Sequence, residues 1–181
     1  LSDLLTAFER DTPATVSKFS YDIAPPYQHI EHELFKLKSS IKKGNKNRLE
    51  MILSRQFNLR QEFDEKNPLE PESQFNLTTK GSDINWKHFN TKGFKSELGI
   101  NALQQVNTST GSLLIPNYKS NDAGIYVIEQ LDKYRYSLEG GLRFDIKHTS
   151  VFMWQNNKIT NPQHYYNNFS SNLGARYSFS E

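Results

Sequence analysis

Between residues 48 and 63 the chain alternates apolar and polar side chains with a period of two, and this feature constrains the fold most. Six of the eight odd positions are apolar, whereas Ile52 is the single apolar residue among the eight even positions. Successive side chains of a β-strand point to opposite faces, so the pattern predicts a strand with one apolar and one polar face. The same contrast recurs over 94–107, 134–146 and 168–179. An all-β fold is therefore expected.

Three further stretches have the composition of strands but a less regular pattern. Over 28–41 the apolar positions change from even to odd, and over 75–89 they change parity across Gly81. A one-residue bulge would produce each change, and a glycine within a strand commonly marks a bulge. The range 124–130 is short and rich in β-forming residues. About seven strands are expected in all, at 28–41, 48–63, 75–89, 94–107, 124–130, 134–146 and 168–179.

The stretch ahead of these strands, residues 1–26, is expected to form a loop or a short helix. The apolar residues between Leu1 and Phe8 are spaced near a helical period, which favours a short helix over 1–11. The last residues, from Arg176 onward, read as part of a strand or its end. We therefore expect the chain to be a segment of a longer protein.

The connections between the strands alternate in length. Short and long connections follow one another in the order 42–47, 64–74, 90–93, 108–123, 131–133 and 147–167. Strands that run up and down between two edges would place all the short turns on one edge. Runs of about 13–16 residues reach roughly 43–53 Å, whereas soluble strands have about 5–6 residues and a tilted transmembrane strand needs about 9–11. These features together predict an antiparallel up-and-down transmembrane β-barrel with an apolar outer face and a polar lumen.

Composition removes several classes of protein. No run approaches the ~20 consecutive apolar residues of a spanning helix, and the 181 residues include no cysteine. A disulfide scaffold, a thiolate zinc site and a cysteine nucleophile are thereby excluded. The net charge of +2 gives no electrostatic basis for binding nucleic acid. Aromatic residues make up 13% of the chain, which argues against disorder.

The residues also give no basis for catalysis or a cofactor. His29 and His32 would project to opposite faces of a strand and so could not share a metal ion without a bulge. The carboxylates of Glu62, Asp64 and Glu65 are better explained by a solvated strand end than by acid–base chemistry. No nucleophile set, P-loop or dinucleotide fingerprint is present, and Gly140-Gly141 indicates close packing or curvature within a strand. We therefore expect no enzyme, no cofactor and no metal site.

The two expected faces assign further residues. Charged side chains on the polar faces would be unfavourable against hydrocarbon, so they are interpreted as lumen-wall residues: Arg48, Arg60, Lys95, Glu97, Arg135, Glu139, Arg143 and Asp145. Aromatic side chains near the short-turn ends are expected to form an interfacial girdle: Tyr134, Tyr136, Tyr177 and Phe179. Aromatic and histidine side chains of the long loops are candidates for ligand contact or for packing the loops: Tyr118, His148, Trp154, Tyr165 and Tyr166.

Several stretches also resemble a known family. The chain resembles, over roughly residues 21–180, the barrel of TonB-dependent outer-membrane receptors of Gram-negative bacteria. The matching stretches are 26–32, 114–118, 123–129, Leu138-Glu-Gly-Gly-Leu-Arg-Phe-Asp145 and 168–179. The resemblance implies a 22-stranded barrel around an N-terminal plug, as in plugged barrels of that size. The seven expected strands would be about a third of such a barrel.

The resemblance also implies a function and a location. It implies a segment of an outer-membrane receptor that takes up a scarce solute, with energy transmitted through the TonB complex. An iron–siderophore complex is the expected solute, with cobalamin or a glycan as alternatives. The implied partners are outer-membrane lipid, the plug of the same protein, TonB and the ligand. A passive porin or adhesin-like barrel would share these patterns, and a soluble carbohydrate-binding β-sandwich would use the apolar faces as its core.

Overall fold

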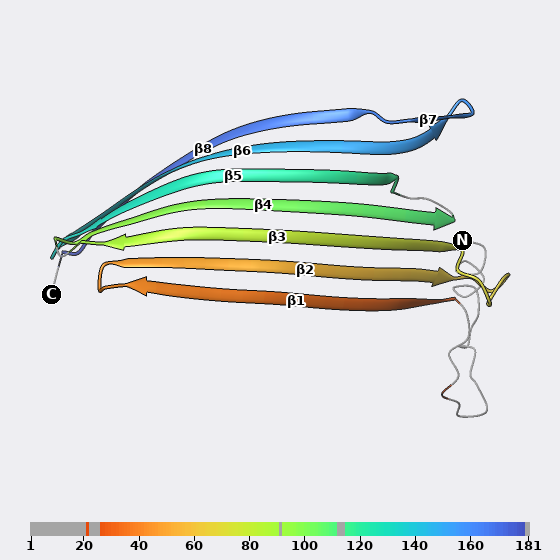
Figure 1. Ribbon diagram of the computed structural model, residues 1–181, viewed down its shortest axis with the longest axis horizontal. Coiled ribbons are helices and arrows are strands. Elements are labelled where there is room, and N and C mark those ends of the chain that lie inside the picture. The colour runs from red at the N-terminus through yellow and green to blue at the C-terminus, as the bar shows by residue number, and fades with distance from the viewer. Residues whose placement is uncertain (1–20, 22–25, 91, 112–114, 180–181) are drawn as a thin grey trace, which may run out of the picture.

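The computed structural model, which describes residues 21, 26–90, 92–111 and 115–179, is a single antiparallel β-sheet (Figure 1). The strands lie side by side in chain order, and the last two both pair with β6. Their bounds are β1 Tyr27–Lys43, β2 Asn47–Phe63, β3 Ser73–Phe89, β4 Phe94–Gly111, β5 Asn117–Asp132, β6 Tyr136–Gln155, β7 Lys158–Thr160 and β8 Gln163–Tyr177. The all-β, up-and-down prediction is confirmed. The sheet is open, because β1 and β8 each pair on one side only.

The pairing register is continuous along every ladder, so the two predicted bulges are wrong. In β1 the pairs run without a gap from Tyr27–Phe63 to Lys43–Asn47, and Gly81 pairs in step with Ser54 and Leu103. The parity change in β1 therefore moves apolar residues from one face to the other. The register must be read strand by strand to see this, because a bulge and a change of face give the same sequence pattern.

Cross-strand partners share a face, which divides the sheet into two surfaces. We call the surface that carries Met51, Ile84, Ile100, Ile125 and Phe144 the apolar face, and the opposite surface the polar face. Three successive rows on the apolar face contain no charged residue. The central row reads Ser39, Met51, Ile84, Ile100, Ile125, Phe144 and Phe169 from β1 to β8. We call these three rows, which run through Leu53, Met51 and Leu49 in β2, the apolar band.

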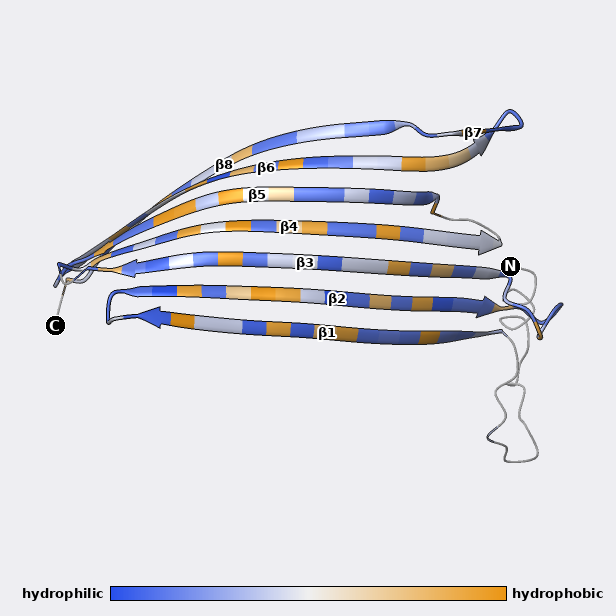
Figure 2. Cartoon of the chain, in the orientation of Figure 1, coloured by the Kyte–Doolittle hydropathy of each residue, from blue (hydrophilic) through white to orange (hydrophobic). Residues whose placement is uncertain are grey.

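The band is not packed into a core. No hydrophobic residue is buried in the described part of the chain, and Leu49, Leu98 and Leu138 are 42%, 45% and 44% exposed. A soluble β-sandwich would bury these side chains against a second sheet, whereas the described strands form one sheet. Figure 2 shows the alternation of hydropathy along the strands. An uncovered apolar face of this kind is typical of a barrel wall, in which it would be the side towards lipid.

Polar and aromatic residues border the band. Beyond its side nearest the loops lies a row formed by Arg55, Lys80, Gln104, Asn121 and His148. At the short-turn end Tyr136 pairs with Tyr177, whose ring lies 5.0 Å from that of Phe179 in an edge-on arrangement. These aromatic residues lie where the predicted girdle requires them. Tyr134 lies in the turn before β6 and is 78% exposed.

Two predicted long loops are largely strand. β4 continues to Gly111 and β5 begins at Asn117, while most of 147–167 belongs to β6, β7 and β8. A tight turn joins β6 to β7 through Asn156 and Asn157, whose φ angles are +52° and +59°. Both residues are left-handed, as a type I′ hairpin turn requires. Beyond the band both faces of a strand meet water, so the apolar–polar alternation that would reveal the strand is lost.

The expected loop or helix within 1–26 lies outside the described residues, apart from Tyr21 and Pro26. Among the residues described, no helix is long and apolar enough to cross a bilayer.

Candidate functional site

The polar face carries a connected set of ion pairs near the short-turn end. The Lys87 ammonium lies 2.9 Å from the carboxylate of Glu50 in β2 and 3.7 Å from that of Glu97 in β4. Arg48 contributes a further contact of 3.5 Å to Glu50. One lysine thus links three neighbouring strands. Because these charges lie on the face opposite the apolar band, they would line the interior of a barrel.

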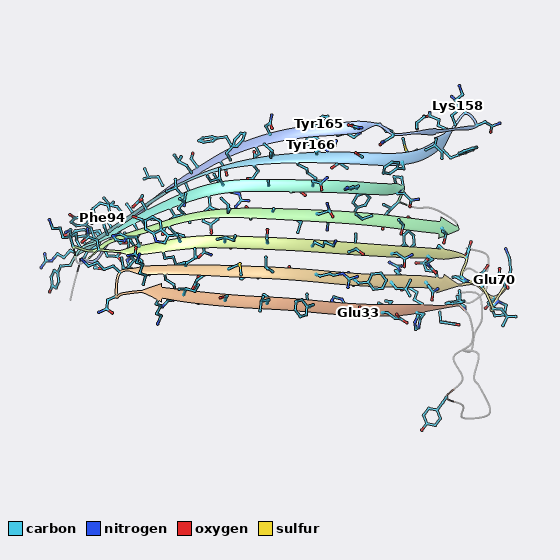
Figure 3. The ribbon with its side chains drawn as sticks, viewed as in Figure 1. Glu33, Glu70, Phe94, Lys158, Tyr165 and Tyr166 are labelled. Atoms are coloured by element: carbon cyan, nitrogen blue, oxygen red, sulfur yellow. The ribbon has the colours of Figure 1, made fainter. Side chains whose placement is uncertain are left out.

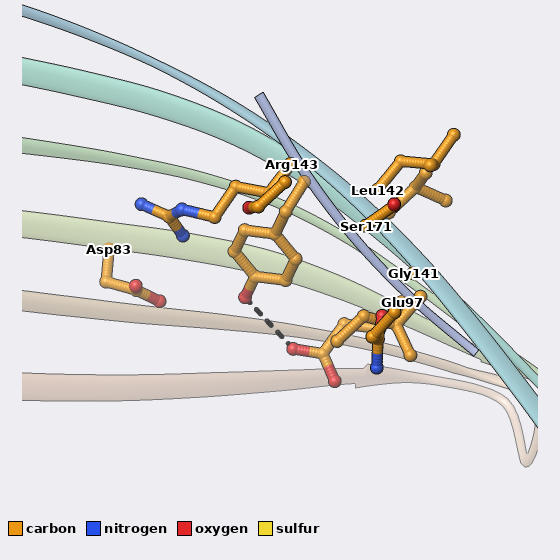
Figure 4. Close-up of a pocket in the computed structure, with 11 residues that line it drawn as sticks. Asp83, Glu97, Gly141, Leu142, Arg143 and Ser171 are labelled. Carbon is orange, nitrogen blue, oxygen red and sulfur yellow. Dashed lines mark hydrogen bonds between the residues drawn. The ribbon is translucent and has the colours of Figure 1, made fainter. Parts of the chain in front are cut away.

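A second group continues the set across β4, β5 and β6. The Tyr126 hydroxyl donates a hydrogen bond of 3.0 Å to Glu97, and the Arg143 guanidinium lies 5.8 Å from the Tyr126 ring centre. Arg143 also pairs with Asp145 and donates 2.9 Å to the Asn101 side chain. Glu97, Tyr126 and Arg143 border a shallow hollow of about 520 Å³ on the polar face, which is shown in Figure 4.

Glycine makes this arrangement sterically allowed. Gly99 is the direct partner of Tyr126, and a Cβ placed at Gly99 would overlap the tyrosine ring. The ring can therefore lie flat across β4 only because position 99 has no side chain. Gly141 has the same relation to Asn172, whose side-chain oxygen would clash with a Cβ at that position. Close packing is thus the reason for Gly141, as its place in a strand predicts.

Most of the predicted wall residues do lie on the polar face. Arg60, Lys95 and Arg143 have carboxylate partners in Glu62, Asp132 and Asp145 respectively. Arg135 is the exception, because it lies in the turn between β5 and β6, with its guanidinium 5.9 Å from the Tyr134 ring centre. Three of the pairs join residues two apart on one strand, so the set is not purely a cross-strand ladder.

Asp132 anchors the short turn at the end of β5. Its carboxylate accepts a hydrogen bond of 2.7 Å from the Lys95 ammonium and another of 2.6 Å from the Ser137 hydroxyl. The Lys95 hydrogen bond, followed by that of Ser137, lowers the pKa of Asp132 to about 2. The turn end is therefore held by a charged carboxylate at neutral pH.

The most buried described residues are polar and include three near the loop end of the polar face. Asn107 is 6% exposed, Ser109 5% and Ser120 2%. The Ser109 hydroxyl donates 3.1 Å to the backbone oxygen of Ile115, and the Asn117 side chain accepts from the Ser109 backbone N–H. These bonds fasten the connection between β4 and β5 onto the sheet. Sequence reasoning placed these residues in a loop or at a strand end and so missed them.

The five candidate ligand residues do not form one cluster. Tyr118 and Tyr166 lie on the polar face, whereas the register places His148, Trp154 and Tyr165 on the apolar face, beyond the band. His148 and Tyr165 stack with ring centres 4.4 Å apart, and both contact the Gln163 side chain. Figure 3 shows Tyr165 and Tyr166 following one another along β8. Whether any of them binds a ligand stays a prediction.

The two histidines near the start of β1 also lie apart. His29 is on the apolar face and contacts Glu31 at 3.0 Å, and His32 is on the polar face. The described residues contain no group of three or more His, Cys, Asp or Glu side chains that could hold a metal ion.

Comparison with known proteins assigns this sheet to a family. The family described as TonB dependent receptor-like, beta-barrel, matches residues 8–181. The chain belongs to this family of TonB-dependent receptor barrels. The family consists of receptors and transporters, which work with a plug domain and TonB and bind small ligands. No curated protein sequence matches the chain.

Two solved structures share the fold of this TonB-dependent receptor barrel. The unliganded ferric citrate transporter FecA superposes with a TM-score of 0.63 at 14% identity, over 85% of this chain and 26% of FecA. The ferric yersiniabactin uptake receptor FyuA from Yersinia pestis gives 0.55 at 12% identity, over 86% of this chain and 27% of FyuA. The chain therefore spans about a quarter of the length of each receptor.

Proposed function

We propose that this chain forms part of the wall of an outer-membrane receptor that takes up a scarce solute with energy supplied through TonB. The observation that carries the proposal is the two-faced sheet, with three uncharged rows on one face and paired charges on the other. In a membrane this arrangement suits a barrel whose outer face meets lipid and whose interior is wet or filled by protein. Membership of the receptor family supports energy coupling over passive diffusion.

An iron chelate is the solute that we propose. FecA and FyuA, which share the fold, are named for ferric citrate and ferric yersiniabactin. In this chain Tyr118 and Tyr166 lie on the polar face of strands that reach beyond the band, so they could contact a solute entering from the loop side. Cobalamin and a glycan are the alternative solutes.

The polar face also suits a plug. Asn85 is 9% exposed, and its side-chain oxygen has no hydrogen-bond partner within the described part of the chain. An acceptor buried in this way is unfavourable unless a donor reaches it. A rotation of the Asn85 amide would bring this oxygen to the surface of the polar face, where a plug segment could supply that donor.

The main alternative is a passive porin or adhesin-like barrel, which would show the same two faces. Uptake by the full-length receptor that carries this chain separates the two. Cells that express the receptor are given radiolabelled ferric citrate or a ferric siderophore, with and without TonB or a protonophore. We expect uptake to require both TonB and the proton gradient. Uptake that is unchanged when either is removed would establish the passive pore instead.

A further inference from the structure

The basic residues of β2 to β6 divide by face according to whether they have a partner. On the polar face every lysine and arginine of these strands lies within 4.0 Å of a carboxylate. These are Arg48, Arg60, Lys87, Lys95, Arg143 and Lys147. On the apolar face the side chains of Arg55, Lys80 and Lys119 are exposed and form no hydrogen bond or ion pair with any residue that the structure describes. Within β2 to β6, carboxylate partners are supplied to the basic residues of one face and not to those of the other.

The three unpartnered residues lie together at one border of the apolar band. Arg55 and Lys80 are direct cross-strand partners in the row next to the band, on its loop side. Lys119 lies in β5, one row further from the band. Because β5 is two strand spacings from the β3 strand of Lys80, the backbones of Lys80 and Lys119 are roughly 10 Å apart across the sheet. Like charges directly opposite each other destabilise a sheet. The pair is therefore costly unless an anion lies between or above the two side chains.

Acidic residues of the same face do not supply that anion. Glu33 lies in β1, next to the strand β2 that carries Arg55. It forms no ion pair with Arg55 among the described contacts. Glu31 contacts His29 instead. Glu129 lies at the opposite border of the band, where it accepts a hydrogen bond from Ser96.

We propose that Arg55, Lys80 and Lys119 bind the phosphate groups of membrane lipids at the loop-side border of the barrel. Long basic side chains at this depth keep their stems against apolar surface and place their charges in the headgroup layer. Gln104, Asn121 and His148 continue the same row and add polar groups that can hydrogen-bond a headgroup. The inference rests on the proposed placement of the band in a membrane, and goes beyond solute uptake.

The test uses the full-length receptor that carries this chain, purified in a neutral detergent. Native mass spectrometry counts the lipid retained during titration with dioleoylphosphatidic acid, and with dioleoylglycerol, which differs only in lacking the phosphate. The variant Arg55→Gln/Lys80→Gln/Lys119→Gln removes the three charges. A basic residue near an anionic membrane surface contributes a binding energy that corresponds to roughly fivefold in affinity. We expect the triple variant to bind phosphatidic acid at least tenfold more weakly and dioleoylglycerol unchanged.

Two further variants serve as controls. Lys36→Gln/Lys38→Gln/Lys42→Gln removes three positive charges from the polar face of β1 and should bind phosphatidic acid like the wild type. Arg55→Lys/Lys80→Arg keeps both charges and should also retain binding. Heat-modifiable mobility in electrophoresis shows that each variant is folded.

Three results would overturn the proposal. They are wild-type affinity in the triple variant, equal binding of dioleoylglycerol, and full displacement of the lipid by millimolar inorganic phosphate, which would make free phosphate the ligand. Insertion of the wild type into phosphatidylcholine vesicles is measured in parallel. If the receptor does not insert, the proposed membrane function fails. If it inserts and the triple variant keeps phosphatidic acid, only the lipid site fails.

Discussion

The substitution Ile100→Arg places a charge at the centre of the apolar band. Ile100 lies on β4 between its direct partners Ile84 and Ile125, and it is 50% exposed on the face that we assign to lipid. None of the three rows of the band contains a carboxylate that could pair with the new guanidinium. An arginine on the lipid face of a barrel at the bilayer midplane costs about 2–4 kcal/mol. The ratio of folded to unfolded receptor should therefore fall by a factor of roughly 30–700.

The matched control is Leu103→Arg, three residues along the same strand but on the polar face. Leu103 pairs with Asp122 and with Gly81, so an arginine there meets a carboxylate on one side and a residue without a side chain on the other. The control should cost less than about 1 kcal/mol, as for a partly exposed ion pair. Guanidinium titration of the receptor folded into phosphatidylcholine vesicles measures both free energies. Equal costs for the two variants, or a cost below about 0.5 kcal/mol for Ile100→Arg, would refute the assignment of faces.

Three other sites give testable outcomes. Gly99→Ala should destabilise the folded receptor by about 1–3 kcal/mol through overlap with the Tyr126 ring, and Tyr126→Ala in the same chain should recover most of this in guanidinium titrations. The pKa of Asp132 is lowered from 3.8 to about 2, so the Lys95–Asp132 contact stabilises the fold above pH 4, and this contribution is lost as the pH falls towards 2. Asp132→Asn should remove that part of the acid dependence in thermal melts, and an unchanged acid profile would contradict the pairing. Asn157→Val puts a β-branched residue at a φ of +59°, so protease cleavage at this hairpin should become faster while global stability changes little.

The parts of the fold that sequence predicted well are those with two chemically different surroundings. In β2, which has one apolar and one polar face, the predicted range 48–63 nearly coincides with the observed 47–63. In the extensions of β5 and β6 both faces meet water, and residues such as Asn121 and Thr149 carry no parity signal. The Asn156–Asn157 turn was the available local signal, since asparagine tolerates a positive φ.

The candidate site was less predictable because its contacts depend on register. Parity alone places Arg143 and Glu97 on the polar face, but it does not show that Tyr126 joins them or that Gly99 provides the room. The alternation would have separated Tyr118 and Tyr166 from His148 and Tyr165 if the predicted loops 108–123 and 147–167 had been recognised as strand. A residue that is assigned to a loop is not placed on either face of the sheet, so this separation could not be predicted.

On the apolar face the outermost apolar residues of β1 and β8 mark two borders that run obliquely to the three rows of the band, and the slope of these borders gives the tilt of the strands. In β1 the apolar residues of this face extend on the loop side to Phe35, which lies in the same cross-strand row as Tyr165 of β8. In β8 the run of apolar residues begins at Phe169, four residues nearer the short turns. The loop-side border therefore shifts by about four residues over six steps between strands.

The other border shifts in the same direction. Ile41 of β1 shares a row with Ser171, whereas the apolar residues of β8 continue to Tyr177, six residues further. A shift of four to six residues over six strand spacings corresponds to a tilt of roughly 25–35°. Outer-membrane barrels have strands tilted by about 35–45°. The apolar pattern thus predicts both the face that would meet lipid and the angle at which the strands would cross the membrane, and polarised infrared spectroscopy of the oriented receptor should give this tilt. Strands parallel to the membrane normal would contradict this slope, because the oblique borders of the apolar residues would then cut across the bilayer.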